Sequence, residues 1–166
     1  MMKFLLVALV FGLFGLARAK DISGVWYTVA IAADDREKIQ EDKPLRMYIR
    51  RLQCYSKCQE LDIIFQVQLK GQCTLTTVRG RDIGDGVWRD EYEGENHYKL
   101  MKQTKDFIIF YNENVDAAGW KTKMIYALGK EKALDAGQTK DIEAYSGSQR
   151  IPAQNIEYVY LTDTCP

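Results

Sequence analysis

The sequence has little histidine, little proline and no excess of charge of either sign. His97 is the only histidine in 166 residues, and 23 basic residues balance 23 acidic ones. One histidine leaves little material for a Ser-His-Asp or Cys-His arrangement, and nucleic-acid-binding proteins normally show a strong basic excess. Gly-rich phosphate loops, H-E-x-x-H and EF-hand spacings are also missing. The sequence therefore argues against an enzyme and a nucleic-acid partner, and we expect no cofactor and no bound metal.

Long apolar runs are confined to the N-terminus. Phe4–Leu16 is an unbroken run of apolar and small residues that follows Lys3 and precedes the small-x-small triplet of residues 17–19. This pattern is typical of a secretory signal peptide and is too short to span a bilayer. We therefore predict a signal peptide at residues 1–19, a secreted extracellular protein without membrane insertion, and a single domain over residues 20–166. Removing Lys3 and Arg18 leaves two more acidic than basic residues.

Cysteine is scarce but even in number, with Cys54, Cys58, Cys73 and Cys165. Secretion favours disulfides, and four cysteines allow three pairings. The C-x-x-x-C spacing could seed a metal site, but no second cysteine pair follows at zinc-ligand spacing. Two structural disulfides are therefore expected, and spacing alone leaves their pairing open.

Alternation of apolar and polar residues dominates the rest of the chain. Leu45 and Met47, for example, alternate with Arg46 and Tyr48, which gives a strand one buried and one exposed face. Short turn signals separate eight such segments: Val25–Ala32, Leu45–Arg50, Leu61–Gln68, Thr74–Arg79, Val87–Glu93, His97–Lys102, Phe107–Tyr111 and Lys123–Leu128. This spacing predicts an all-β protein, an eight-stranded antiparallel up-and-down β-barrel.

Two segments differ from this pattern. Asp34–Pro44 is a long charged connection, which is either a lid over one end of the barrel or an inert surface loop. After residue 130, Asp135 and Gln138 form a capping box for a helix that Gly147 and Pro152 end. The helix is weakly apolar, so we expect one C-terminal α-helix packed outside the barrel, followed by a short final strand over residues 156–161.

A barrel of eight strands encloses a space just wide enough for one small ligand. The inward faces supply aliphatic, aromatic and methionine side chains with a few uncharged polar groups such as Asn96 and Asn112. That mixture suits a pocket for a small hydrophobic molecule, although the same side chains would also fill an ordinary core. Composition does not decide between the two.

Several motifs occur in the order typical of one family. Gly24-Val25-Trp26-Tyr27 resembles the G-x-W signature of the lipocalins, and two later motifs resemble the second and third motifs of that family. A C-x-x-x-C hallmark and two C-terminal segments resemble its mammalian odorant-binding branch. These are Asn114-Val115-Asp116 with Gly119 and Thr122, Leu128-Gly129-Lys130, and Cys54-Tyr55-Ser56-Lys57-Cys58, together with Ile151–Ile156 and the closing residues Thr162–Pro166. The resemblance covers essentially the whole mature chain. The second motif lacks the Thr and Tyr that usually flank its Asp, and Lys130 replaces the usual Arg, which implies a softer closed end.

The resemblance implies a secreted carrier of small volatile hydrophobic molecules, odorants or pheromones, held inside the barrel. It also implies the disulfides Cys54–Cys58 and Cys73–Cys165, and a Trp26 that plugs the closed end beside Lys130. The lumen would be lined by Ile31, Leu45, Met47, Phe65, Val78, Tyr92, Asn96, Tyr98, Phe110, Asn112, Met124 and Tyr126.

Asp90 has the same parity as Tyr92, so it would also point into the lumen. Burying an unpaired carboxylate is costly, so Asp90 must lie near the open mouth, bond to a tyrosine or stand off register. We predict that Asp90, beside Tyr92 or Tyr126, selects ligands with a hydroxyl or an amine.

Two other functional classes stay open at this point. A lipocalin-fold enzyme acting on a small lipophilic substrate would need a free reactive thiol in the lumen. Alternatively, the protein itself is a pheromone recognised through its surface. A homodimer or a chemosensory receptor is a partner that the sequence neither requires nor excludes.

Overall fold

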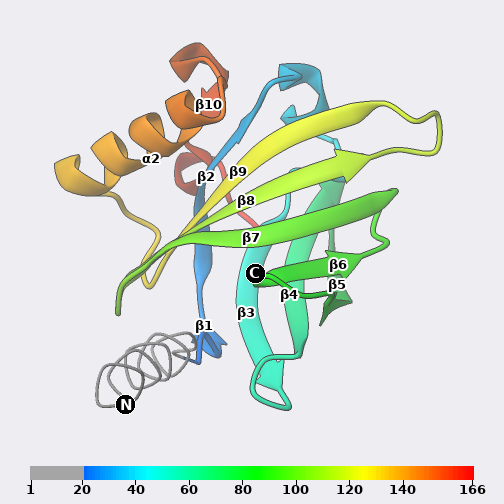
Figure 1. Cartoon of the computed structure of the whole chain (residues 1–166). Coiled ribbons are helices and arrows are strands. Elements are labelled where there is room, and N and C mark those ends of the chain that lie inside the picture. The colour runs from blue at the N-terminus through cyan, green and yellow to red at the C-terminus, as the bar shows by residue number, and fades with distance from the viewer. Residues whose placement is uncertain (1–20) are drawn as a thin grey trace.

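The structure is a computed structural model that describes residues 21–166, so the predicted signal peptide at residues 1–19 lies outside the described residues. The alternating segments form one antiparallel sheet in which each strand from the third to the eighth pairs with the next (Figure 1). Its strands are β1 (Gly24–Val25), β2 (Tyr27–Ala33), β3 (Tyr48–Tyr55), β4 (Glu60–Leu69), β5 (Gln72–Asp82), β6 (Val87–Asp90), β7 (Glu95–Gln103), β8 (Phe107–Val115), β9 (Lys121–Gly129) and β10 (Ile156–Glu157).

The N-terminal segment joins the two ends of this curled sheet. β1 pairs with β3, and β2 pairs with β9 at the other end of the strand order. The Trp26 backbone N–H donates to the Arg50 carbonyl (3.2 Å), and the Thr28 Oγ1 accepts from the Ile49 N–H (2.8 Å). The expected all-β, up-and-down antiparallel fold is confirmed, with the first of its eight barrel strands split at Trp26.

Several boundaries differ from the sequence prediction, and the strand expected over residues 87–93 ends at Asp90. The segment expected as one strand over residues 25–32 is broken at Trp26, because the chain changes its pairing partner there from β3 to β9. The second strand begins at Tyr48, so Leu45 and Met47 precede it. The final strand is only Ile156–Glu157, and residues 159–161 form a 3-10 helix instead (η3, Val159–Leu161).

The C-terminal helix lies on the outside of the sheet (Figure 1). The helix α2 (Ala136–Ser148) begins at Asp135, whose carboxylate accepts from the Gln138 N–H (2.7 Å), while the Gln138 side chain accepts from the Asp135 N–H (3.0 Å). The predicted capping box is thus present. The helix ends at Ser148, between the Gly147 and Pro152 that were predicted to end it, and Arg150 (φ 60°) takes the left-handed conformation after the helix. No helix within residues 21–166 is long and apolar enough to cross a membrane.

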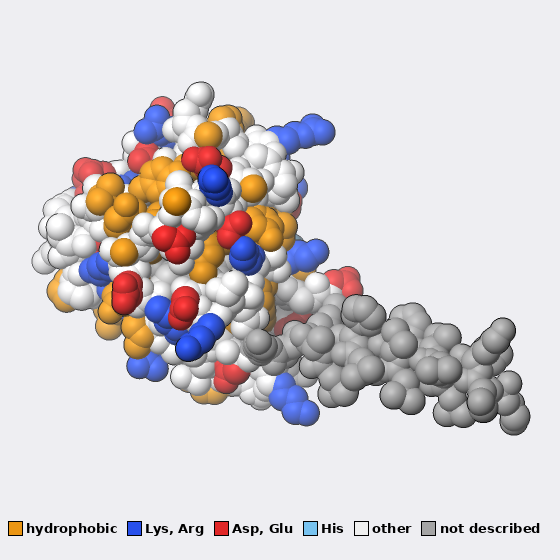
Figure 2. Space-filling model, turned by 90° about the vertical axis from the view of Figure 1, so that its left-hand side faces the viewer, with side chains coloured by type: hydrophobic (Ala, Val, Ile, Leu, Met, Phe, Trp, Pro, Cys, Tyr) orange, Lys and Arg blue, Asp and Glu red, His pale blue; other side chains and the backbone are white. Residues whose placement is uncertain are grey.

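Two hydrophobic clusters flank the sheet. The inner core fills the barrel and includes Ile31, Phe65, Phe110, Met124 and Tyr126. The outer core lies beneath α2 and consists of Val29, Ala30, Ala32, Phe107, Ile109, Ile125, Ala127, Ile142, Ile151 and Ile156. On the face of the molecule where α2 lies, acidic and basic side chains are interspersed (Figure 2). The helix therefore buries one apolar face of the sheet and leaves the barrel interior as a separate compartment.

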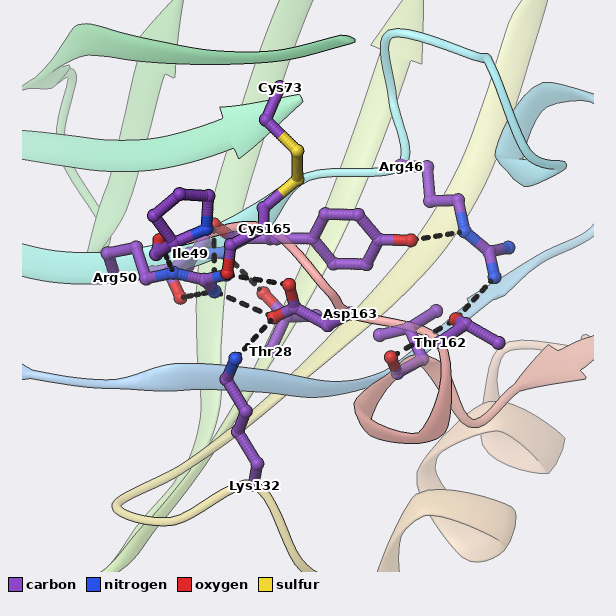
Figure 3. Close-up of polar contacts among 12 residues, drawn as sticks. Thr28, Arg46, Ile49, Arg50, Cys73, Lys132, Thr162, Asp163 and Cys165 are labelled. Carbon is purple, nitrogen blue, oxygen red and sulfur yellow. Dashed lines mark hydrogen bonds and ion pairs between the residues drawn. A yellow bond between two sulfur atoms is a disulfide. The ribbon is translucent and has the colours of Figure 1, made fainter. Parts of the chain in front are cut away.

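The C-terminal tail is tied to the outside of β3 (Figure 3). The Arg50 guanidinium donates two hydrogen bonds to the Asp163 carboxylate (2.6 and 2.7 Å) and a third to the Cys165 carbonyl (3.0 Å). Cys165 is also bonded to Cys73, which closes a loop of 92 residues. These long-range contacts explain why the chain leaves the sheet after Glu157 instead of continuing as a strand.

Candidate ligand-binding site

The centre of the barrel holds a small apolar cavity of about 10 Å³, lined by Ile49, Leu52, Leu61, Ile63, Tyr98, Phe110 and Tyr126. This is room for about one water molecule, because aromatic side chains fill the space around it. The Tyr98 and Tyr126 ring centroids lie 6.5 Å apart, and the Trp88 ring meets Phe110 edge-on at 6.2 Å. The lumen is therefore closed by side chains that rotate about single bonds, not by backbone.

The predicted lumen residues come together in this interior. Ten of them belong to the inner core or pack against it: Ile31, Leu45, Met47, Phe65, Val78, Tyr92, Tyr98, Phe110, Met124 and Tyr126. The polar members Asp90, Asn96 and Asn112 are 4%, 0% and 0% exposed. Whether each of them touches a ligand stays a prediction.

Four cavity residues were missing from the predicted set. Leu61 and Ile63 have the same parity as Phe65, and Ile49 has the parity of Met47. Strand alternation alone therefore predicts that these three side chains point into the lumen. Leu52 has the opposite parity from Ile49. A β-bulge between Ile49 and Arg51 shifts the register by one residue and turns Leu52 inward.

A buried polar network lies beside the apolar part of the lumen. The Asp90 carboxylate accepts from Asn96 Nδ2 (2.8 Å) and from the Tyr92 N–H (3.0 Å). Asn96 Oδ1 in turn accepts from Asn112 Nδ2 (3.2 Å) and Asn114 Nδ2 (2.9 Å). Asn114, which was noticed in the sequence only as part of a motif, is fully buried. β6, β7 and β8 bring these four side chains together through their pairing register.

Burial shifts the pKa of several groups at this site. The pKa of Asp90 is raised, because burial disfavours the charged carboxylate more than the hydrogen bonds from Tyr92 and Asn96 favour it. The pKa values of Tyr98 and Tyr126 lie well above the ordinary tyrosine value, chiefly through burial. Both phenols are therefore neutral, and the Tyr98 hydroxyl interacts with the Asp90 carboxylate.

The charged loop of residues 34–44 covers the mouth of the barrel. Its short 3-10 helix η1 (Arg36–Ile39) places Ile39 in the inner core with no exposed surface. Hydroxyl groups from inside the barrel hold the following residues, since Tyr92 donates to the Pro44 carbonyl (2.7 Å) and Tyr126 to the Leu45 carbonyl (2.7 Å). Of the two interpretations of this loop, the structure matches the lid.

Residues of the lid and of the neighbouring turns line a pocket of about 350 Å³ at the mouth. Lys38 Nζ lies 2.9 Å from the Asp116 carboxylate, which also accepts from the Ala118 and Trp120 backbone N–H groups. Asn114 lines the same pocket. The mouth pocket and the polar network therefore share Asn114.

The opposite end of the barrel is closed by Trp26, which is 3% exposed and donates through Nε1 to the Ile22 carbonyl (2.8 Å). The Lys130 ammonium lies 3.7 Å from the centroid of the Trp26 ring and donates to the Val25 carbonyl (2.8 Å). A cation over an aromatic face is attractive. Gly24 (φ 137°) passes close by, and a Cβ there would lie 3.2 Å from Lys130 Nζ. The motif residues thus form a plug held by an ammonium group.

All four cysteines are paired. Cys54 is bonded to Cys58 and Cys73 to Cys165, which is the pairing that the family resemblance implies. Within residues 21–166, no group of three or more His, Cys, Asp or Glu side chains is placed to hold a metal ion. The lumen therefore offers hydrophobic burial and a hydrogen-bonding network as its means of holding a molecule.

Comparisons with known proteins agree with this architecture. The chain is 44% identical to odorant-binding protein 1b of Mus musculus over 170 aligned residues, which cover 100% of this chain and 99% of the relative. It is 42% identical to aphrodisin of Cricetus cricetus, again over 100% and 99% of the two chains. The crystal structure of aphrodisin, described as a sex pheromone from female hamster, superimposes with a TM-score of 0.85 at 41% identity and covers 88% of this chain and 99% of that one.

The family assignment rests on sequence and fold together. The model of the lipocalin / cytosolic fatty-acid binding protein family matches residues 23–163. This range begins just before the Gly24-x-Trp26 motif and ends at Asp163, the residue that anchors the tail to β3. The chain therefore belongs to the lipocalin / cytosolic fatty-acid binding protein family.

Proposed function

We propose that this protein is a secreted carrier that binds small volatile hydrophobic molecules, odorants or pheromones, inside the barrel. The observation that carries the proposal is the separate inner core, lined by apolar and aromatic side chains and covered by a lid. The names of the most similar relatives support the same ligand class. Secretion rests on the signal-peptide pattern of residues 1–19, and the single domain over residues 20–166 belongs to the same proposal.

Ligand entry in this proposal requires side-chain movement. The cavity holds only about 10 Å³, whereas small-molecule pockets have about 300 Å³ or more. Rotation of Phe110 and Tyr98 enlarges the space without moving a strand, because both rings line the cavity from strand positions. Tyr126 couples this movement to the lid, since its ring lines the cavity and its hydroxyl holds the Leu45 carbonyl.

A binding role, and not catalysis, is part of the proposal. The enzyme alternative needs a reactive thiol in the lumen, and all four cysteines are used in disulfides. A thiol titration of the unreduced protein should find no free thiol, and one reactive thiol per chain would revive the enzyme alternative.

Displacement of a fluorescent hydrophobic probe tests the carrier function. Small odorants should displace the probe at micromolar concentrations. Ile63→Phe adds volume to a side chain that lines the cavity and should weaken binding, whereas Leu75→Phe on the outer face, where Leu75 is 62% exposed, should leave it unchanged. Circular dichroism verifies that both variants fold. No displacement by any hydrophobic compound would overturn the proposal.

A further inference from the structure

Asp90 sets the direction of every amide in the buried network. An ionised carboxylate only accepts hydrogen bonds, so Asn96 turns its Nδ2 toward Asp90 Oδ1 (2.8 Å). The second N–H of the same amide donates to the Tyr92 carbonyl (2.6 Å). Asn96 Oδ1 must then point away from Asp90, toward β8.

This direction passes on to the next two side chains. Asn112 and Asn114 both donate through Nδ2 to Asn96 Oδ1, and the other N–H of Asn114 donates to the Glu93 carbonyl (3.1 Å). Their own carbonyl oxygens are therefore the free ends of the network. Reversing either amide would place two oxygens against each other, so the arrangement follows from Asp90 Oδ1 acting as the acceptor for Asn96.

The free ends of the carboxylate and the two amides are hydrogen-bond acceptors. Asn112 Oδ1 and Asn114 Oδ1 are buried and have no hydrogen-bond partner within residues 21–166. Asp90 Oδ2 has none of standard geometry, although the Tyr98 hydroxyl interacts with this carboxylate. The Thr122 hydroxyl, across the strand pair from Asn114, is buried and unpaired as well. Buried polar atoms without partners are rare and costly. A surplus of acceptors beside a carboxylate is complementary to a molecule that supplies a donor.

The network lies between two spaces. Asn114 lines the pocket at the mouth, beneath the lid. Tyr98, whose hydroxyl interacts with the Asp90 carboxylate, lines the apolar cavity. A small amphiphile with its apolar body in the cavity and its polar head toward the mouth would place that head at the network.

We propose that the Asp90–Asn96–Asn112–Asn114 network is a polar subsite that selects ligands with a hydrogen-bond donor, alcohols and protonated amines, over ketones and alkanes of the same skeleton. The inference rests on the proposed carrier function and specifies its ligand class. A ketone offers only an acceptor, for which the Thr122 hydroxyl is the one unpaired donor at this subsite within residues 21–166, whereas three free oxygens face it as acceptors. An ammonium group matches both the free oxygens and the negative charge of Asp90.

Competition between octane, octanone, octanol and octylamine for a bound fluorescent probe tests the selection. We expect octanol and octylamine to bind about tenfold or more tightly than octanone and octane, as charge-assisted hydrogen bonds imply. Asp90→Asn keeps the shape but removes the charge, so it should abolish most of the preference for octylamine. Octane affinity should stay the same and thereby reports an intact lumen. Asp85→Asn, which removes an exposed carboxylate from a turn, is the matched control and should keep the wild-type ranking.

Each outcome bears on the inference separately from the carrier function. Equal binding of the four compounds would overturn the selection and leave the carrier function intact. An unchanged ranking in Asp90→Asn would show that Asp90 does not direct the network. Displacement by none of the four would overturn the carrier function, and the inference with it.

Discussion

On β9, successive residues face two different environments. Ile125 and Ala127 point to the outer core beneath α2, whereas Met124 and Tyr126 point to the inner core. The region beneath α2 is apolar apart from Ser146, a buried residue of the helix whose hydroxyl lacks a partner within residues 21–166. The inner core adjoins buried Asp90 and three asparagines, and several of their oxygens lack partners within residues 21–166. Because such groups weaken a purely structural core, the difference indicates that the inner compartment is shaped for a ligand.

The largest expected effect comes from truncating an inner ring. Phe110→Ala should lower the free energy of unfolding by about 3–5 kcal/mol, because it removes a buried aromatic side chain. It should also enlarge the cavity, so bulkier hydrophobic ligands should gain affinity relative to small ones. Urea denaturation and probe competition measure the two effects. Loss of stability without any change in ligand size preference would contradict the view that the inner core binds ligands while the outer core is only structural.

The matching change in the outer core is Ile142→Ala. Ile142 has no exposed surface and packs under α2, so the variant should lose about 2–4 kcal/mol of unfolding free energy. Ligand ranking should not change, since the residue does not border the lumen. Glu143→Ala, on the exposed side of the same helix, is the control and should shift stability by less than about 0.5 kcal/mol. A changed ligand preference in Ile142→Ala would show that the two cores are coupled.

The charge inside the barrel should appear in the pH dependence of stability. The folded-state pKa of Asp90 is raised, so the folded chain still holds this proton at pH values where the unfolded chain has lost it. Asp90 therefore lowers stability as pH rises from about 4 through its folded pKa, at about 1.4 kcal/mol for each unit of elevation. Asp90→Asn lacks this dependence. Subtracting the two stability curves isolates it, and a difference that does not vary with pH would contradict the burial of an ionising Asp90.

The smallest effect is expected at the lid. Lys38→Met removes the ion pair with Asp116. The Lys38 and Asp116 side chains are 32% and 25% exposed, so solvent screens the pair and its removal should cost little binding energy. The probe should dissociate roughly two- to fivefold faster, as measured by stopped-flow fluorescence. Lys105→Met, in the turn at the closed end, should leave the rate unchanged. Equal dissociation rates in wild type and Lys38→Met would show that the ion pair does not help to hold the lid closed.

Much of the fold could be predicted because its signals are local. Alternation marked the barrel strands, and Asp135 with Gln138 marked the start of α2, since both depend only on residues a few positions apart. Prediction failed where a distant contact intervened. The β-bulge after Ile49 turns Leu52 inward against its parity, and no residue pattern announces that shift.

The candidate site divides in the same way. The ten apolar and aromatic side chains of the predicted lumen set lie in or against the inner core, on the face that alternation indicated for most of them. Their contact with a ligand is still a prediction. Asn114 and Thr122 share the parity of Asn112 and Met124, so alternation offered the signal, but only the pairing of β7, β8 and β9 showed that Asn114 completes a network.

The sequence by itself determined the strands, the helix cap and the family, because each follows from neighbours along the chain or from motif order. Only the tertiary structure decided the partner change at Trp26, the tail drawn out of the sheet by Arg50 and Cys73, and the orientation of the amides around Asp90. Each of these depends on groups that lie far apart in the sequence and meet only when the barrel closes.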